Sequence, residues 1–82
     1  MQLLHQVSGM VGAEGLRLVN GDCTVVCERP RLGDYTDDMA RRLAALLGAP
    51  VGVKAKRAEG LGAIGRVEGI ACLAVVLLAS GP

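Results

Sequence analysis

Aromatic residues are nearly absent from this chain of 82 residues: Tyr35 is the only one, and there is no Phe or Trp. The core must therefore be built from Val, Leu, Ile and Ala. The chain has enough apolar residues for this, since 51% of its residues are hydrophobic. Twelve glycines add to the entropy that is lost on folding, and a domain of this size buries only ~60% of its unfolded surface. The composition predicts one small domain over residues 1–82, stabilised by association with other chains.

An excess of one charge is also missing. Nine Lys and Arg residues face eight Asp and Glu residues, which leaves a net charge of +1. A nucleic-acid partner is not expected, because no surplus of cations is available to neutralise phosphates. The high apolar content likewise excludes a disordered tail.

Long apolar runs are missing as well. The most apolar stretch, residues 70–79, has ten residues, far fewer than the ~20 that span a bilayer. The first residues lack the basic start and apolar run of a signal peptide, so we expect no membrane contact and no targeting segment. Cys23, Cys27 and Cys72 are interpreted as buried free thiols, since the first two lie ~13 Å apart along a strand, too far for a disulfide. These features favour the reducing cytoplasm.

Hydrophobic periodicity predicts five elements in the order α-β-α-β-α. They are helices over residues 3–11, 34–47 and 66–79 and strands over residues 18–28 and 51–57. A helix between the two strands suits a parallel βαβ unit. The predicted fold class is α/β (α+β), with a small sheet packed on helices. Two strands leave unpaired edges, so the domain looks like half of a larger fold.

Few residues in the chain are suited to catalysis. His5 is the only histidine, so no nucleophilic triad can be assembled, and we interpret it as a solvated or packed side chain. Residues 60–65 spell G-x-G-x-x-G after a strand and before a helix. A dinucleotide site would also need a following strand and an acidic residue ~20 positions on. A turn with close backbone approach is therefore the better interpretation.

Two segments carry a resemblance to a known family. Residues 53–71 read V-K-A-K-R-A-E-G-L-G-A-I-G-R-V-E-G-I-A. They resemble the C-terminal signature V-K-A-T-T-T-E-x-L-G-F-x-G-R-x-E-G-I-A of the 2-C-methyl-D-erythritol 2,4-cyclodiphosphate synthase family. Residues 27–32, C-E-R-P-R-L, are similar to the family's cytidine loop. The resemblance covers essentially all of this chain and the C-terminal half of the family's chain.

The resemblance implies a homotrimer with active sites between subunits. The family enzyme cyclises a cytidine-diphospho-methylerythritol 2-phosphate and releases CMP, a phosphorus–oxygen lyase reaction of non-mevalonate isoprenoid biosynthesis. Glu59 would ligate a Mg²⁺ or Mn²⁺ ion that bridges the diphosphate, and Arg66 and Glu68 would lie near the threefold axis. The implied nucleotide contacts are Cys27, Glu28, Arg29, Pro30, Arg31, Leu32, Lys56, Arg57 and Ala58.

The chain also departs from the family. The family's zinc ligands belong to the N-terminal half, so zinc is not expected here. Lys56, Arg57 and Ala58 replace three threonines, and Arg57 stands where a threonine contacts the diphosphate; Lys56 and Arg57 can also be read as a solvated strand end. One hypothesis is a half-domain that binds the cytidine diphosphate moiety and needs a chain supplying the missing half for activity. The other is a non-catalytic homo-oligomerisation module that has lost ligand binding.

Overall fold

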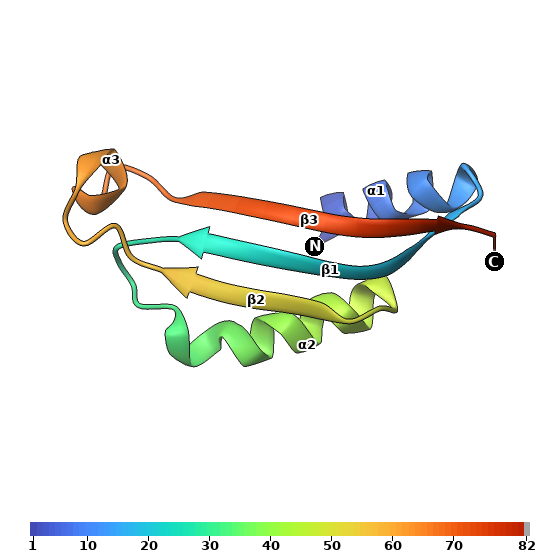
Figure 1. Ribbon diagram of the computed structural model, residues 1–82, viewed down its shortest axis with the longest axis horizontal. Coiled ribbons are helices and arrows are strands. Elements are labelled where there is room, and N and C mark those ends of the chain that lie inside the picture. The colour runs from blue at the N-terminus through green and yellow to red at the C-terminus, as the bar shows by residue number, and fades with distance from the viewer. Residues whose placement is uncertain (82) are drawn as a thin grey trace.

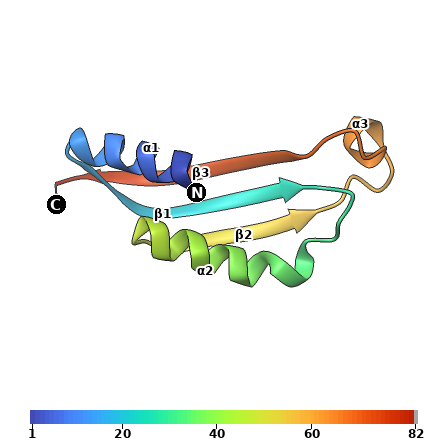
Figure 2. The same ribbon diagram turned by 180° about the vertical axis from the view of Figure 1, so that it is seen from behind.

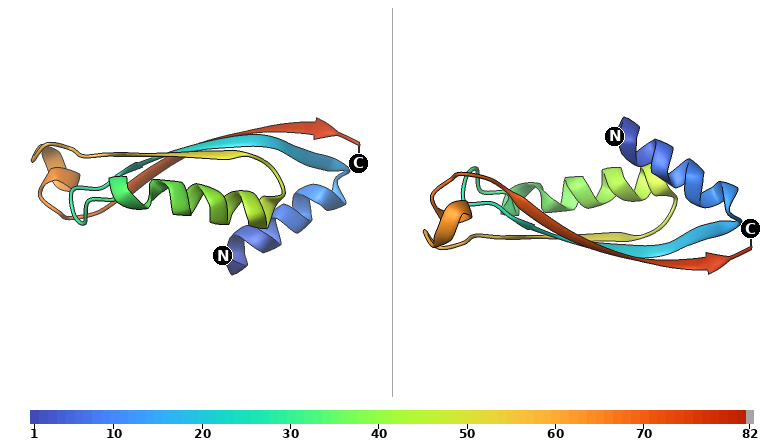
Figure 3. Two further views of the ribbon diagram at one scale, coloured as in Figure 1. Left: turned by 90° about the horizontal axis from the view of Figure 1, so that it is seen from below. Right: turned by 90° about the horizontal axis from the view of Figure 1, so that it is seen from above.

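The computed structural model describes residues 1–81 and shows helices packed on one three-stranded sheet. Both long helices lie on the same face of the sheet (Figures 1, 2 and 3). The small α+β class with a sheet packed on helices is thus confirmed. In chain order the elements are α1 (Gln2–Ala13), β1 (Leu16–Val26), the 3-10 turn η1 (Gly33–Tyr35), α2 (Thr36–Leu47), β2 (Val51–Lys56), α3 (Gly62–Gly65) and β3 (Ala71–Ser80).

The central unit is the expected parallel βαβ crossover. Strand β1 pairs in parallel with β2, from Gly21 opposite Val51 to Val26 opposite Lys56. Helix α2 connects the two strands and ends at Gly48, whose φ of 69° places it in the left-handed region that glycine adopts easily. The helix packs against β2. The alternation of apolar and polar residues in β2 turns Val51, Val53 and Ala55 towards this helix.

The expected last helix over residues 66–79 is wrong. Residues Ala71–Ser80 form β3, which pairs antiparallel with β1 over its length and puts β1 in the centre of the order β2-β1-β3. A continuous apolar run cannot be assigned to a buried helix or a strand by periodicity alone. The sheet therefore has three strands. Cys72 lies on a strand and is exposed, and Cys23 is half-buried, so only Cys27 is the buried thiol that we expected.

The core of this unit is small. Among the apolar side chains of residues 1–81, only Val25, Cys27 and Ala49 are buried. Strand β3 is apolar on both faces, and the side chains of Leu73, Val75 and Leu77 are 66%, 74% and 55% exposed. No helix in the described part of the chain is long and apolar enough to cross a membrane.

Candidate functional site

The ends of β1 and β2 bring two distant segments together. Because the strands are parallel, the residues that follow Val26 and Lys56 emerge at the same edge of the sheet. The Cys27 amide donates a hydrogen bond to the Lys56 carbonyl, with 2.9 Å between N and O. The loop after β1, the turn after β2 and α3 thus share one end of the molecule, away from the chain termini (Figure 1).

The loop after β1 is shaped by its own backbone. The buried Cys27 thiol donates to the Arg29 carbonyl over 3.0 Å, and the Arg29–Pro30 peptide is cis. The Tyr35 amide closes the loop by donating to the Leu32 carbonyl over 2.9 Å. Arg29, Pro30 and Arg31 are exposed in this loop.

Glu28 anchors this loop to the turn after β2. Its carboxylate accepts a hydrogen bond from Nη2 of Arg57 at 2.7 Å and another from the Ala58 amide at 3.0 Å. Burial alone would raise the pKa of Glu28, but the Arg57 guanidinium and the Ala58 amide outweigh it and the pKa is lowered. The sequence pattern predicted a strand that extends to residue 28. The strand ends at Val26, and Glu28 turns inward.

Glu59 sits in a turn that is held by close backbone approach. Its φ is 53°, in the region that favours glycine, and its side chain is exposed. A Cβ added to Gly65 would lie 2.3 Å from the carbonyl carbon of Gly60, so no side chain fits there. The turn interpretation of the G-x-G-x-x-G segment is therefore confirmed.

A pocket of about 330 Å³ opens between the two segments. Its charged side chains are Arg31, Lys56 and Arg57 against Asp34, so an excess of cations faces it. The complete lining is Cys27, Arg31, Leu32, Gly33, Asp34, Ala55, Lys56 and Arg57. Such a pocket can hold an anionic group beside backbone donors and acceptors.

Not all of the predicted site residues meet in this pocket. Arg29, Pro30, Ala58 and Glu59 are outside its lining, as is Glu28. Arg66 and Glu68 lie beyond α3, where the Arg66 side chain donates to the Glu68 carboxylate at an exposed position.

Sequence reasoning missed Gly33, Asp34 and Ala55 as lining residues. The signal for Gly33 and Asp34 was their place directly after the predicted loop, and that for Ala55 was its place one residue before Lys56 in the second strand.

The residues present fit only one of the two metals implied by the family resemblance. Among residues 1–81, no three His, Cys, Asp or Glu side chains come together as a metal site requires, and His5 is exposed on α1. Zinc needs three or four protein ligands, so these residues do not fit zinc. Magnesium is often held by one or two carboxylates together with substrate phosphates, and the exposed Glu59 fits that role.

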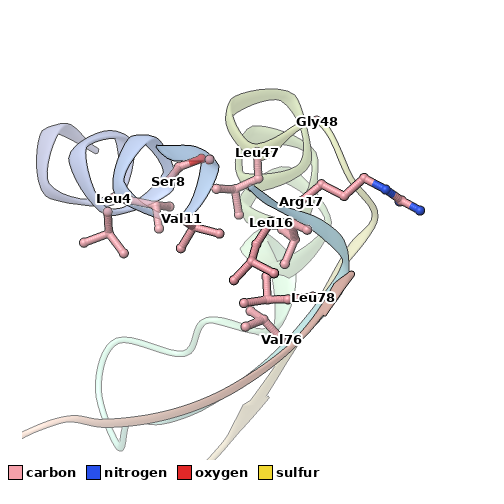
Figure 4. A pocket seen from close by; sticks show the side chains of 12 residues that line it. Leu4, Ser8, Val11, Leu16, Arg17, Leu47, Gly48, Val76 and Leu78 are labelled. Atoms are coloured by element: carbon pink, nitrogen blue, oxygen red, sulfur yellow. The ribbon is translucent and has the colours of Figure 1, made fainter. Parts of the chain in front are cut away.

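A larger pocket of about 450 Å³ lies at the other end of the molecule, between α1, the end of α2, β1 and β3 (Figure 4). Its lining is mainly aliphatic, with Ser8 and Arg17 as the polar side chains. The charged end of Arg17 points away from the other labelled side chains. This pocket therefore offers no chemistry comparable to that at the ends of β1 and β2.

Known proteins are similar to this chain in sequence and in fold. The YgbB family matches residues 1–79. A 2-C-methyl-D-erythritol 2,4-cyclodiphosphate synthase of Symbiobacterium thermophilum is 46% identical over 82 residues, which is 96% of this chain and 52% of that protein. The bifunctional IspDF from Campylobacter jejuni superimposes with a TM-score of 0.90 at 37% identity, covering 95% of this chain and 22% of that chain.

A structure of 2C-methyl-D-erythritol-2,4-cyclodiphosphate synthase in a CDP-bound form superimposes with a TM-score of 0.81 at 29% identity. It covers 93% of this chain and 50% of that chain. The chain thus spans about half the length of the curated relatives that it matches. It belongs to the YgbB family and resembles the cyclodiphosphate synthases of non-mevalonate isoprenoid biosynthesis.

Proposed function

We propose that residues 1–82 form one domain that binds the cytidine diphosphate moiety in a 2-C-methyl-D-erythritol 2,4-cyclodiphosphate synthase. The observation that carries the proposal is the meeting of the loop over residues 27–32 with the cations Lys56 and Arg57 beside one pocket. The likeness to a synthase in a CDP-bound form supports the choice of nucleotide.

Each part of the site has a role in this proposal. Backbone groups of residues 29–32 bind the edge of the cytosine, since N–H and C=O groups can match its donors and acceptors. Lys56 and Arg57 bind the diphosphate through charge-assisted hydrogen bonds, each worth about 1.5–3 kcal/mol when well aligned. Glu59 would hold Mg²⁺ or Mn²⁺, and the ion would neutralise charge on the phosphates.

Cyclisation requires more than these residues supply. The family resemblance implies that zinc is the Lewis acid of the reaction. The described residues do not fit zinc. We therefore propose that residues 1–82 alone bind nucleotide without completing the reaction. A segment that supplies the family's N-terminal half, on the same or another chain, is the required partner.

The proposed assembly is a homotrimer with Arg66 and Glu68 near its axis. Support comes from β3, because Leu73, Val75 and Leu77 form an exposed apolar face on an edge strand. Covering such a strand with other subunits removes both the apolar surface and the open edge. We further propose a cytoplasmic location, since the three cysteines are free thiols, as in proteins of reducing compartments.

A titration followed by amide chemical shifts tests nucleotide binding. CDP with Mg²⁺ is expected to shift residues 27–34 and 55–60 with micromolar to millimolar affinity, and ADP much less, because a purine is too large for a pyrimidine pocket. Glu59→Ala is expected to weaken CDP more than CMP. The matched control is Glu14→Ala, an exposed carboxylate just after α1, which should change neither affinity.

A second candidate function is a non-catalytic oligomerisation module. The bare β3 strand favours it, as does the replacement of the family's threonines by Lys56, Arg57 and Ala58. If CDP and ADP shift the same surface residues equally, or shift none, while the chain still assembles, this second function is the correct one.

A further inference from the structure

The Glu28 carboxylate is buried and already has two partners. Its side chain is 7% exposed, and each carboxylate oxygen is already bonded: Oε1 to Arg57 and Oε2 to the Ala58 amide. A buried carboxylate is stable only when such partners neutralise it. Its position at the end of β1 links the loop after β1 to the turn after β2.

Arg57 is held by this contact at the wall of the pocket. Its side chain is 36% exposed and lines the pocket beside Lys56. One Nη2–H donates to Glu28, and a guanidinium has five N–H donors, so others remain for an anion. Without Glu28 the long side chain would sample many rotamers and would lose conformational entropy on binding.

We propose that Glu28 is a positioning residue that orients the Arg57 guanidinium for the diphosphate of a nucleotide. The inference rests on the proposed function, since it assigns how that site selects a diphosphate over a monophosphate. Arg57 stays bonded to Glu28 and presents its remaining donors to the phosphates. The pair therefore acts as one unit, in which the carboxylate fixes the direction of the cation.

Glu28→Gln separates orientation from packing. The amide oxygen of Gln can still accept from the Ala58 N–H, while the ion pair with Arg57 is lost. With the full chain, we expect CDP with Mg²⁺ to bind roughly tenfold more weakly, the size of one misaligned charge-assisted contact, and CMP to bind unchanged. The control is Asp38→Asn on α2, which removes an exposed carboxylate paired with Arg41 and Arg42 and should leave both affinities unchanged.

A double-mutant cycle supplies the decisive readout. Arg57→Gln should weaken CDP at least as much as Glu28→Gln does. Adding Glu28→Gln to it should then cause no further loss, because Glu28 acts through Arg57. A general loss of structure would instead weaken CDP and CMP alike and would add to the effect of Arg57→Gln.

The outcomes separate this inference from the proposed function. If the unchanged chain binds no CDP, the proposed function fails. If it binds CDP and Glu28→Gln binds equally well or more tightly, Glu28 merely masks the cation and the positioning role is overturned. Should Glu28→Gln not fold, Arg57→Lys keeps the charge without the planar fork. It is expected to weaken CDP roughly tenfold, and an unchanged affinity would overturn the inference.

Discussion

The two edge strands of the sheet, β2 and β3, are built on opposite plans. Strand β2 alternates, with Val51, Val53 and Ala55 half-buried on the side of α2 and lysines exposed on the other face. Strand β3 is apolar on both faces, and most of its side chains are exposed. Charged residues on an edge strand discourage pairing with other chains. The difference indicates that the exposed edge of β2 stays in solvent, whereas β3 is suited to contact another chain.

The largest expected effect comes from placing a charge on β3. We expect the unchanged chain to assemble at micromolar concentration and Val75→Lys to be monomeric, because burying an unpaired ammonium in an apolar contact is strongly unfavourable. Sedimentation velocity measures this directly. Ala45→Lys, at an exposed position of α2, is the matched control and should assemble normally. Equal behaviour of the two variants would mean that β3 is not the contact surface.

The next effect concerns the turn that connects the two edge strands. Gly65→Ala would force a Cβ against the Gly60 backbone. We expect it to lower the free energy of unfolding by about 1–3 kcal/mol, as overpacking does, and to weaken CDP by displacing Glu59. Gly69→Ala is the control, because a Cβ there meets nothing within 4 Å. Urea denaturation and the CDP titration measure both effects, and similar results for both variants would contradict the packing argument.

A smaller effect is the loss of stability in acid that protonation of Glu28, the partner of Arg57, would cause. The pKa of Glu28 is lowered in the folded chain, so its contribution to stability is complete above the unfolded pKa of about 4.3 and is lost as the pH falls through the folded value. We expect the free energy of unfolding to decrease more steeply below about pH 4.3 in the unchanged chain than in Glu28→Gln. Urea denaturation between pH 7 and pH 3 tests this. Parallel pH profiles would show that the ion pair is not responsible.

The mildest test uses thiol reactivity to compare β3 with the strand beside it. In the monomeric Val75→Lys variant, we expect iodoacetamide to modify Cys72 first, then Cys23 and last Cys27, because Cys72 is exposed and Cys27 is buried in the single chain. Burial also raises the pKa of the Cys23 thiol, which lowers its thiolate fraction. Mass spectrometry of digested samples gives the order. In the unchanged chain, Cys72 is expected to react more slowly than in Val75→Lys, because assembly covers β3. Equal rates in the two chains would show that assembly does not shield this strand.

The sequence predicted the amphipathic elements correctly and failed at β3, which is apolar on both faces. Helices α1 and α2 and strands β1 and β2 were predictable because one face of each is apolar and the other polar. Residues 66–79 were assigned to a helix, since a segment that is apolar on both faces has no period of two to detect. Its pairing with β1 depends on tertiary contacts that a local pattern does not contain.

The candidate site was predictable to a different degree. The family resemblance pointed to residues 27–32 and 56–59, and the parallel strands do bring these segments to one edge. The Glu28–Arg57 pair was missed because a strand extended to residue 28 puts the carboxylate on the polar face. A signal for the pair was available in the sequence. Glu28 ends one predicted strand and Arg57 ends the next, and the carboxyl ends of parallel strands lie side by side.

The pairing of β1 with β3 also determines how this chain reaches its native state. Leu16 lies opposite Ser80 and Val26 opposite Ala71, so the central strand recruits one of its two neighbours from the far end of the chain. Contacts that are this distant in sequence require a large loop to close first, which slows folding. During synthesis, β1, α2 and β2 can associate while the second edge of β1 is still vacant. That transient edge is where newly made molecules are most prone to aggregate.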